Sequence, residues 1–183
     1  MTKLRIHIFG GPGSGKSFVA AELSRRLGIP AYDLDDLFWD PSASRYGVRA
    51  EAAGRDRRLA AIVAQDGWVI EGVYYGWLAR SFEAADIIIA LSPPIWVRHW
   101  RVIRRFVLRK LGHTTAKHES LMDLWRLLRW SHAYDRQHLA EARAIISGSG
   151  RQILHCATPE QVLAATSNFS LQRPAPRDAR CRR

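Results

Sequence analysis

The sequence predicts an α/β fold in which a parallel sheet lies between two layers of helices. Three observations indicate this class. Segments typical of strands alternate with segments of helical periodicity along the 183 residues, as they do when helices cross over between parallel strands. Residues 87–91 are all apolar, which is typical of a strand buried on both faces. A glycine-rich segment at residues 10–15 joins the first strand directly to the first helix.

The first strand, loop and helix carry the most informative motif. Residues 4–9 alternate between apolar and polar side chains and end in an apolar pair, as a strand entering a core does. The following residues fit the pattern G-x-x-x-x-G-K-[ST] at every defined position: Gly10-Gly11-Pro12-Gly13-Ser14-Gly15-Lys16-Ser17. Apolar residues then recur at helical spacing up to Leu27, and Gly28 follows as a C-terminal cap. A phosphate-binding loop requires this order of strand, loop and helix.

A loop of this kind binds phosphates because glycines leave the backbone N–H groups free to contact phosphate oxygens. The helix that starts near Gly15 adds the positive end of its dipole. We expect Lys16 to bridge the β- and γ-phosphates of ATP, and the Ser17 hydroxyl to bind Mg²⁺. The predicted nucleotide-binding residues are Gly10, Gly11, Pro12, Gly13, Ser14, Gly15, Lys16, Ser17 and Phe18.

The remaining elements follow from apolar runs and from breaks at glycine and proline. Further strands are expected at residues 30–35, 68–71, 86–91 and 152–156. Further helices are expected at residues 50–65, 74–84, 93–111, 120–146 and 159–166. These elements form a single predicted domain of residues 1–168, which a basic tail of residues 169–183 follows.

Composition and charge limit the classes of protein that fit. The formal net charge is +11, and residues 173–183 supply +4 of it through five arginines against Asp178. We expect this tail to be disordered and solvated, with contact to nucleic acid as the alternative. Cys156 and Cys181 are too few for a disulfide framework or a zinc site. With no apolar run near the ~20 residues that span a bilayer, we expect a cytoplasmic protein without a membrane partner.

Acidic residues fall where parallel strands end, and ligands gather at that edge of a parallel sheet. Asp35 and Glu71 close the second and third predicted strands and lie near the expected phosphates. Asp35 is a candidate base for an acceptor hydroxyl or a ligand of a metal-bound water. Its alternative is a helix N-cap, a position that Asp36 also fits. Asp86 begins its strand at the opposite edge and is expected to be structural.

The helix expected at residues 93–111 separates its side chains into two stripes. The basic stripe contains Arg98, Arg101, Arg105 and Arg109, and the apolar stripe contains Trp96, Trp100, Ile103, Val107 and Leu111. We expect the apolar stripe to pack in the core. We expect Arg101 and Arg105 to face the transferring phosphoryl group, because guanidinium groups position and neutralise it. A solvated basic face is the alternative.

Several segments together resemble the nucleotide-kinase branch of the P-loop proteins, which has an adenylate-kinase-like fold. Within this branch the chain is similar to the bacterial topology modulation proteins. The similarity covers about residues 3–166 and is carried by residues 10–17, 32–39, 68–74, 86–105 and 154–159. It implies a P-loop NTPase fold with strand order 2-3-1-4-5, an acceptor-binding insertion at about residues 36–66 and a short helical lid at about residues 98–136.

The resemblance also implies roles for single residues. Glu71 would order a Mg²⁺-bound water, and Arg136 would close on ATP from the far side of the lid. The chain departs from the family where relatives carry an arginine for the acceptor phosphate, because it has Tyr75 and Gly76 there. Its lid is also short and lacks the cysteines of zinc-bearing relatives. Both departures disfavour a nucleoside monophosphate as acceptor.

The predicted function is that of an ATP-dependent phosphotransferase. It would move the γ-phosphoryl group of MgATP to a small acceptor, such as a nucleotide or nucleoside, held near Asp35 and Trp39. The alternative is a nucleic-acid-binding protein that modulates DNA topology and uses ATP as a switch, although no recognised DNA-reading motif is present. Phosphorylation of a nucleic-acid end would combine both activities.

Overall fold

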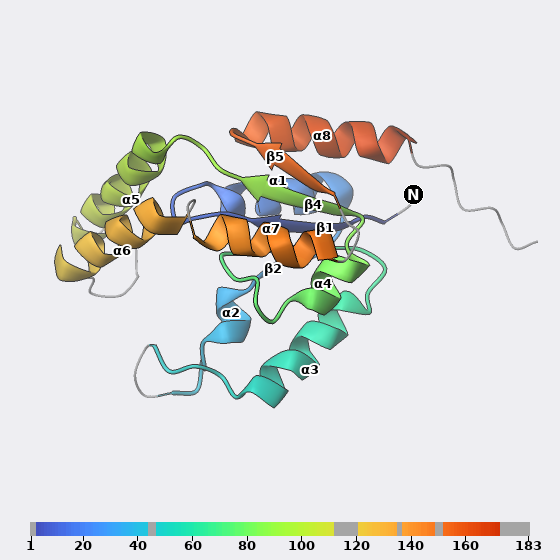
Figure 1. Cartoon of the computed structure of the whole chain (residues 1–183), viewed down its shortest axis with the longest axis horizontal. Coiled ribbons are helices and arrows are strands. Elements are labelled where there is room, and N and C mark those ends of the chain that lie inside the picture. Colours follow the sequence, from blue (N-terminus) through green and yellow to red (C-terminus); the bar gives the residue numbers. More distant parts are fainter. Residues whose placement is uncertain (1–2, 44–46, 112–120, 135–136, 149–151, 173–183) are drawn as a thin grey trace, which may run out of the picture.

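A five-stranded parallel sheet forms the centre of the molecule in the computed structural model, which describes residues 3–43, 47–111, 121–134, 137–148 and 152–172 (Figure 1). The strand order is β2-β3-β1-β4-β5, which confirms both the predicted class and the predicted order. The strands are β1 (Arg5–Phe9), β2 (Ala31–Asp33), β3 (Trp68–Gly72), β4 (Ile87–Leu91) and β5 (Ile153–Cys156).

Two apolar layers lie on opposite faces of the sheet, because side chains alternate along each strand. Ile6 and Ile8 of β1 pack on one face against α1 (Lys16–Leu27) and α8 (Pro159–Gln172). Phe9 packs on the other face. That face is covered by α2 (Asp35–Phe38), α3 (Ala52–Val63), α4 (Ala79–Ala84) and α7 (His138–Gly148).

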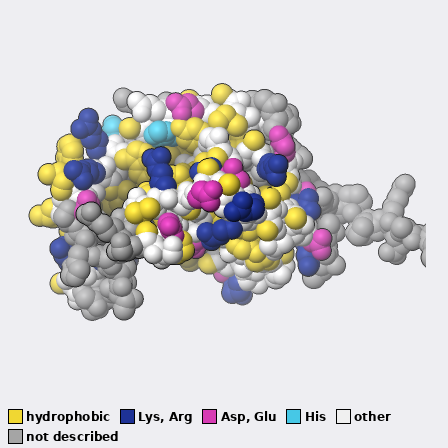
Figure 2. Space-filling view, turned by 90° about the horizontal axis from the view of Figure 1, so that it is seen from below, with side chains coloured by type: hydrophobic (Ala, Val, Ile, Leu, Met, Phe, Trp, Pro, Cys, Tyr) yellow, Lys and Arg dark blue, Asp and Glu magenta, His cyan; other side chains and the backbone are white. Residues whose placement is uncertain are grey.

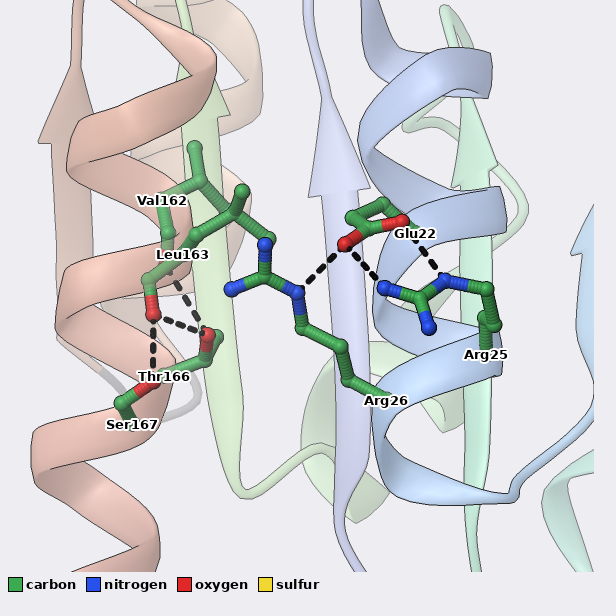
Figure 3. Close-up of polar contacts among 7 residues, drawn as sticks. All are labelled: Glu22, Arg25, Arg26, Val162, Leu163, Thr166 and Ser167. Atoms are coloured by element: carbon green, nitrogen blue, oxygen red, sulfur yellow. Dashed lines mark hydrogen bonds and ion pairs between the residues drawn. The ribbon is translucent and has the colours of Figure 1, made fainter.

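Polar side chains of α1 and α8 make hydrogen bonds within their own helices. Glu22 of α1 accepts hydrogen bonds from Arg25 and Arg26, and the Thr166 and Ser167 hydroxyl groups of α8 donate to carbonyl groups of their own helix (Figure 3). The hydrogen bonds from Arg25 and then Arg26 lower the pKa of Glu22 to about 2. Because exposed ion pairs of this kind contribute little to stability, this layer is held mainly by its apolar packing on the sheet.

Two helices stand apart from the layers, at one end of the sheet (Figure 1). They are α5 (Ile95–Lys110) and α6 (Leu121–Tyr134), which pack against each other. No helix in the described part of the chain is long and apolar enough to cross a bilayer.

The structure corrects several predicted boundaries. The helix expected at residues 120–146 is divided into α6 and α7, and residues 135–136 between them lie outside the described residues. The helix expected at residues 74–84 begins only at Ala79, and α8 continues to Gln172. Residues 169–172 of the predicted tail therefore belong to α8, and its other residues, 173–183, lie outside the described residues.

The second strand is shorter than predicted, and Asp35 therefore begins a helix instead of ending a strand. Strand β2 ends at Asp33, whose carboxylate accepts a hydrogen bond from the Asp35 backbone N–H at 2.9 Å. An Asx turn of this kind competes with the sheet ladder and starts a helix.

The apolar stripe of α5 does not pack in the core, contrary to the prediction. Trp96, Trp100 and the rest of the apolar stripe are exposed, whereas Arg98 is fully buried beside Val102 and Phe106. The physical reason is the polar surface against which the helix packs. Its inner side faces the phosphate-binding loop, whose carbonyl groups need hydrogen-bond donors, and a buried polar group requires such partners.

Candidate active site

The phosphate-binding loop lies between β1 and α1, at the C-terminal edge of the sheet, as predicted. Gly13 and Gly15 have φ angles of 74° and 98°, a left-handed conformation that L side chains rarely adopt. Added Cβ atoms at Gly10 and Gly11 would collide with the Leu91 carbonyl group and the Arg98 guanidinium group. The loop therefore needs its glycines both for backbone conformation and for close packing.

Lys16 supplies a positive charge at the centre of the loop. Its ammonium group donates to the Gly11 carbonyl oxygen at 3.2 Å and to the Ser14 hydroxyl oxygen at 3.4 Å. Burial lowers the pKa of Lys16, and the charge of Glu71 opposes that shift. The loop thus holds a desolvated cation, which interacts more strongly with phosphate than a hydrated one would.

Ser17 and Glu71 form the candidate magnesium position. The Ser17 hydroxyl donates to a Glu71 carboxylate oxygen at 2.5 Å. Burial raises the pKa of the Glu71 carboxyl. Mg²⁺ prefers oxygen ligands and keeps several waters, so the Ser17 hydroxyl would bind the ion directly and the Glu71 carboxylate would hold one of its waters. Nucleotide phosphates and water would complete its shell.

A cavity of about 550 Å³ lies above this pair. It is lined by the loop, by the carboxylates of Asp33, Asp35 and Glu71, and by the arginines Arg101 and Arg105. Burial also raises the pKa of Asp33. The structure therefore brings most predicted site residues to one cavity: Lys16, Ser17, Phe18, Asp35, Glu71, Arg101 and Arg105. Arg136, the remaining predicted catalytic residue, lies outside the described residues.

One side of the cavity has an aromatic wall. The Tyr74 hydroxyl donates to Asp35 at 2.7 Å, and the Tyr74 ring stacks on Phe38 with centroids 4.3 Å apart. Trp39 also lines the cavity. Tyr74 was missed as a site residue, although it closes the family segment at residues 68–74. Tyr75 points elsewhere, because its hydroxyl contacts His138 and Glu141 of α7.

Four side chains of α5 and α6 form hydrogen bonds that join these helices to the loop and its surroundings. We call them the loop–helix seam: Arg98, Arg101, Ser131 and Tyr134. The Arg98 guanidinium donates to the Ser131 carbonyl oxygen at 3.2 Å, and the Ser131 hydroxyl donates to the Pro12 carbonyl oxygen at 3.4 Å. Arg101 donates to the Ser14 carbonyl oxygen at 2.9 Å.

Tyr134 extends the seam to Val73, the residue after β3, because its hydroxyl donates to the Val73 carbonyl oxygen at 3.0 Å. The two helices are therefore fixed to the loop and to the segment that follows β3. Sequence patterns did not reveal Ser131 and Tyr134, since neither belongs to a motif. Arg101 and Arg105 do reach the cavity, and their action on the phosphoryl group stays a prediction.

Comparison with known proteins finds kinases among the proteins that are similar to this chain. No protein-family model matches the chain. A cytidylate kinase of Aeropyrum pernix is 31% identical over 109 residues, which are 54% of this chain and 62% of that protein. The uncharacterized protein YqaC of Bacillus subtilis is 26% identical over 134 residues, 73% of this chain and 74% of that protein. The chain thus spans less than two thirds of the cytidylate kinase.

Solved structures extend the likeness to nearly the whole chain. A shikimate kinase from Acinetobacter baumannii in complex with shikimate superposes with a TM-score of 0.57 at 14% identity, over 93% of this chain and 97% of that one. Such low identity shows the fold alone. The finer resemblance to the topology modulation proteins stays a prediction. The chain therefore has the P-loop kinase fold, and its homologues include nucleotide kinases.

Proposed function

We propose that the protein is a phosphotransferase that moves the γ-phosphoryl group of MgATP to a hydroxyl group of a small acceptor, such as a nucleoside or a nucleotide. One observation carries this proposal. A single cavity joins a complete phosphate-binding loop and two arginines to a carboxylate that an aromatic wall orients. The kinase homologues support the same class of reaction.

Phosphoryl transfer depends on positioning and on neutralising the charge that spreads over the phosphoryl oxygens. Lys16, Arg101 and Arg105 supply three cations to the cavity. Bound Mg²⁺ would add charge neutralisation between the phosphates and the pair of Ser17 and Glu71. The bond from the γ-phosphorus to the bridging oxygen breaks, the acceptor oxygen bonds to the phosphorus, and ADP leaves.

Asp35 is the group best placed to handle the acceptor proton. Its carboxylate lies in the cavity and is held by the Tyr74 hydroxyl at 2.7 Å. A carboxylate within reach of an acceptor hydroxyl aligns that hydroxyl and takes its proton as the new bond forms. Trp39 and Tyr74 would pack against the body of the acceptor, as aromatic side chains commonly do in ligand pockets.

We expect the acceptor to be a hydroxylated molecule without its own phosphate. Tyr75 stands where the family resemblance implies an arginine for the acceptor phosphate, and its side chain is turned to α7. Nucleosides and other polyhydroxylated molecules thus fit better than nucleoside monophosphates. The cytidylate kinase relatives argue for testing both classes.

ATP consumption by the purified protein tests the proposal. We expect one acceptor pool among nucleosides, nucleoside monophosphates, hydroxylated metabolites and short nucleic acids to stimulate turnover. Lys16→Ala should lower that turnover about 10³-fold, because it removes a preorganised cation from the transferring group. Lys3→Ala is the matched control, since Lys3 lies at the opposite edge of the sheet beside Asp66. ATP binding without stimulation by any pool would contradict a kinase and favour the nucleotide-switched nucleic-acid binder.

A further inference from the structure

The outer side of α5 is an exposed apolar stripe, which we call the tryptophan face: Trp96, Trp100, Ile103, Val107 and Leu111. These side chains are 71%, 62%, 42%, 46% and 65% exposed. Their spacing of three and four residues places them along one side of the helix. Figure 2 shows hydrophobic and cationic side chains together at the left end of the molecule, where α5 and α6 lie.

The borders of the tryptophan face are cationic. The Arg104 guanidinium lies 5.8 Å from the centre of the Trp100 ring. Lys110 is exposed and follows Val107 by three residues, which places it beside the face. The 16 residues of α5 contain no aspartate or glutamate. The face therefore combines large apolar side chains with positive charge and has no negative charge on its own helix.

We propose that the tryptophan face binds the surface of an anionic lipid bilayer, with α5 lying in the plane of the interface. Helices with tryptophan and aliphatic residues on one side and lysine and arginine beside them bind at the boundary of headgroups and acyl chains. Tryptophan favours that boundary because its ring is apolar and its N–H is polar. Each border cation adds attraction to anionic headgroups.

Two other occupants fit this face less well. A second copy docked by two-fold symmetry would bring the cationic borders together, and α5 has no acid to pair with them. Single-stranded nucleic acid binds through bases stacked on aromatic rings. Ile103, Val107 and Leu111 offer no ring, whereas acyl chains pack well on all five side chains.

The proposal is independent of the phosphotransferase reaction. Arg101 and Arg105 line the cavity from the inner side of α5, and the tryptophan face lies on the outer side. A bilayer on the outer side would leave the cavity free. The expectation of no membrane partner came from the lack of a spanning segment, and an interfacial helix needs none.

Vesicle sedimentation of the full chain tests the proposal. We expect binding to vesicles of phosphatidylcholine with phosphatidylglycerol and little binding to phosphatidylcholine alone. Trp96→Ala combined with Trp100→Ala should weaken binding about 100-fold, at roughly tenfold for each lost ring. Arg104→Glu combined with Lys110→Glu should weaken it at least about tenfold, through lost attraction to the headgroups.

A charge-matched control distinguishes binding through the tryptophan face from binding through the overall positive charge of the protein. Arg57→Glu with Arg58→Glu makes the same change of charge on exposed positions of α3 and should leave vesicle binding nearly unchanged. ATP binding by each variant reports that it is folded. Equal losses for the two charge pairs, or no sedimentation of folded protein with the anionic vesicles, would overturn the proposal.

Two further results would assign the face to another occupant and so also overturn it. One is a dimer in light scattering that the tryptophan substitutions abolish. The other is binding of single-stranded RNA or DNA that depends on the same tryptophans.

Discussion

The sheet and α5 bury opposite kinds of side chain. Strand β3 is buried at every position, and its Trp68 is fully enclosed. Helix α5 instead buries Arg98 and exposes Trp96 and Trp100. The sheet is covered by apolar helix faces, whereas α5 faces a loop of backbone carbonyl groups. Burial in this protein therefore follows the chemistry of the opposing surface and not hydrophobicity alone.

Two tryptophan substitutions test this contrast most directly. Trp68→Ala should lower the free energy of unfolding by about 3–5 kcal/mol, because it leaves a cavity in the core. Trp100→Ala should change it by less than about 0.5 kcal/mol, as expected for an exposed position. Urea unfolding of both variants measures the difference. A large cost for Trp100→Ala in dilute solution would mean that the face is covered there, and light scattering would show whether a second copy covers it.

Replacement of the buried arginine tests the other side of the contrast. Arg98→Met should cost about 2–4 kcal/mol, because it leaves a buried carbonyl group and removes a packed guanidinium group. It should also weaken ATP binding, since Arg98 packs directly on Gly11. Arg104→Met is the matched control on the exposed side of the same helix. Equal stability of the two variants would show that the guanidinium of Arg98 contributes nothing to the fold.

The parts of the structure that were predicted correctly are marked by local patterns in the sequence. The loop is specified by glycines, Lys16 and Ser17, and the central strands by apolar runs between breaks. The strand order came from the family resemblance that the segments between residues 10 and 159 carry, since no local pattern determines which strands pair.

The orientation of α5 had no such signal. Its two stripes were correctly separated by helical spacing, but spacing does not say which stripe faces the protein. The usual rule places the apolar stripe inside. Buried residues are indeed mostly apolar, but an apolar residue need not be buried, because much apolar surface remains exposed in folded proteins. Arg98, Ser131 and Tyr134 meet only after α5 and α6 have folded onto the loop, so their contacts could not be predicted.

A pH titration of stability tests the sheet without involving α5 or α6. His7 of β1 is fully buried, with its Nδ1 atom 2.6 Å from the Ser81 hydroxyl. Burial lowers the pKa of His7 from 6.5 to about 3. Between these values the unfolded chain binds a proton that the folded chain does not. Stability should therefore fall as the pH falls, by roughly 2–3 kcal/mol from pH 6.5 to 4.5.

Urea unfolding across this pH range measures the slope. His7→Gln should remove most of the slope, although it also loses the ring contact with Phe82. His132→Gln, an exposed substitution on α6, should leave the slope unchanged. A slope that persists in His7→Gln would mean that another group titrates, and His155 is the next candidate because burial also lowers its pKa.

The smallest expected effect lies where the two regions meet. The Ser131 hydroxyl donates to the Pro12 carbonyl oxygen over a long 3.4 Å, so Ser131→Ala should cost about 0.5–1 kcal/mol. Arg98 contacts the same segment of α6 through the Ser131 carbonyl oxygen. Combining Ser131→Ala with Arg98→Met should therefore cost less than the sum of the single changes, by about 0.5–1 kcal/mol. Strict additivity would instead mean that Arg98 supports the loop through Gly11 alone, and that α6 is held by Tyr134.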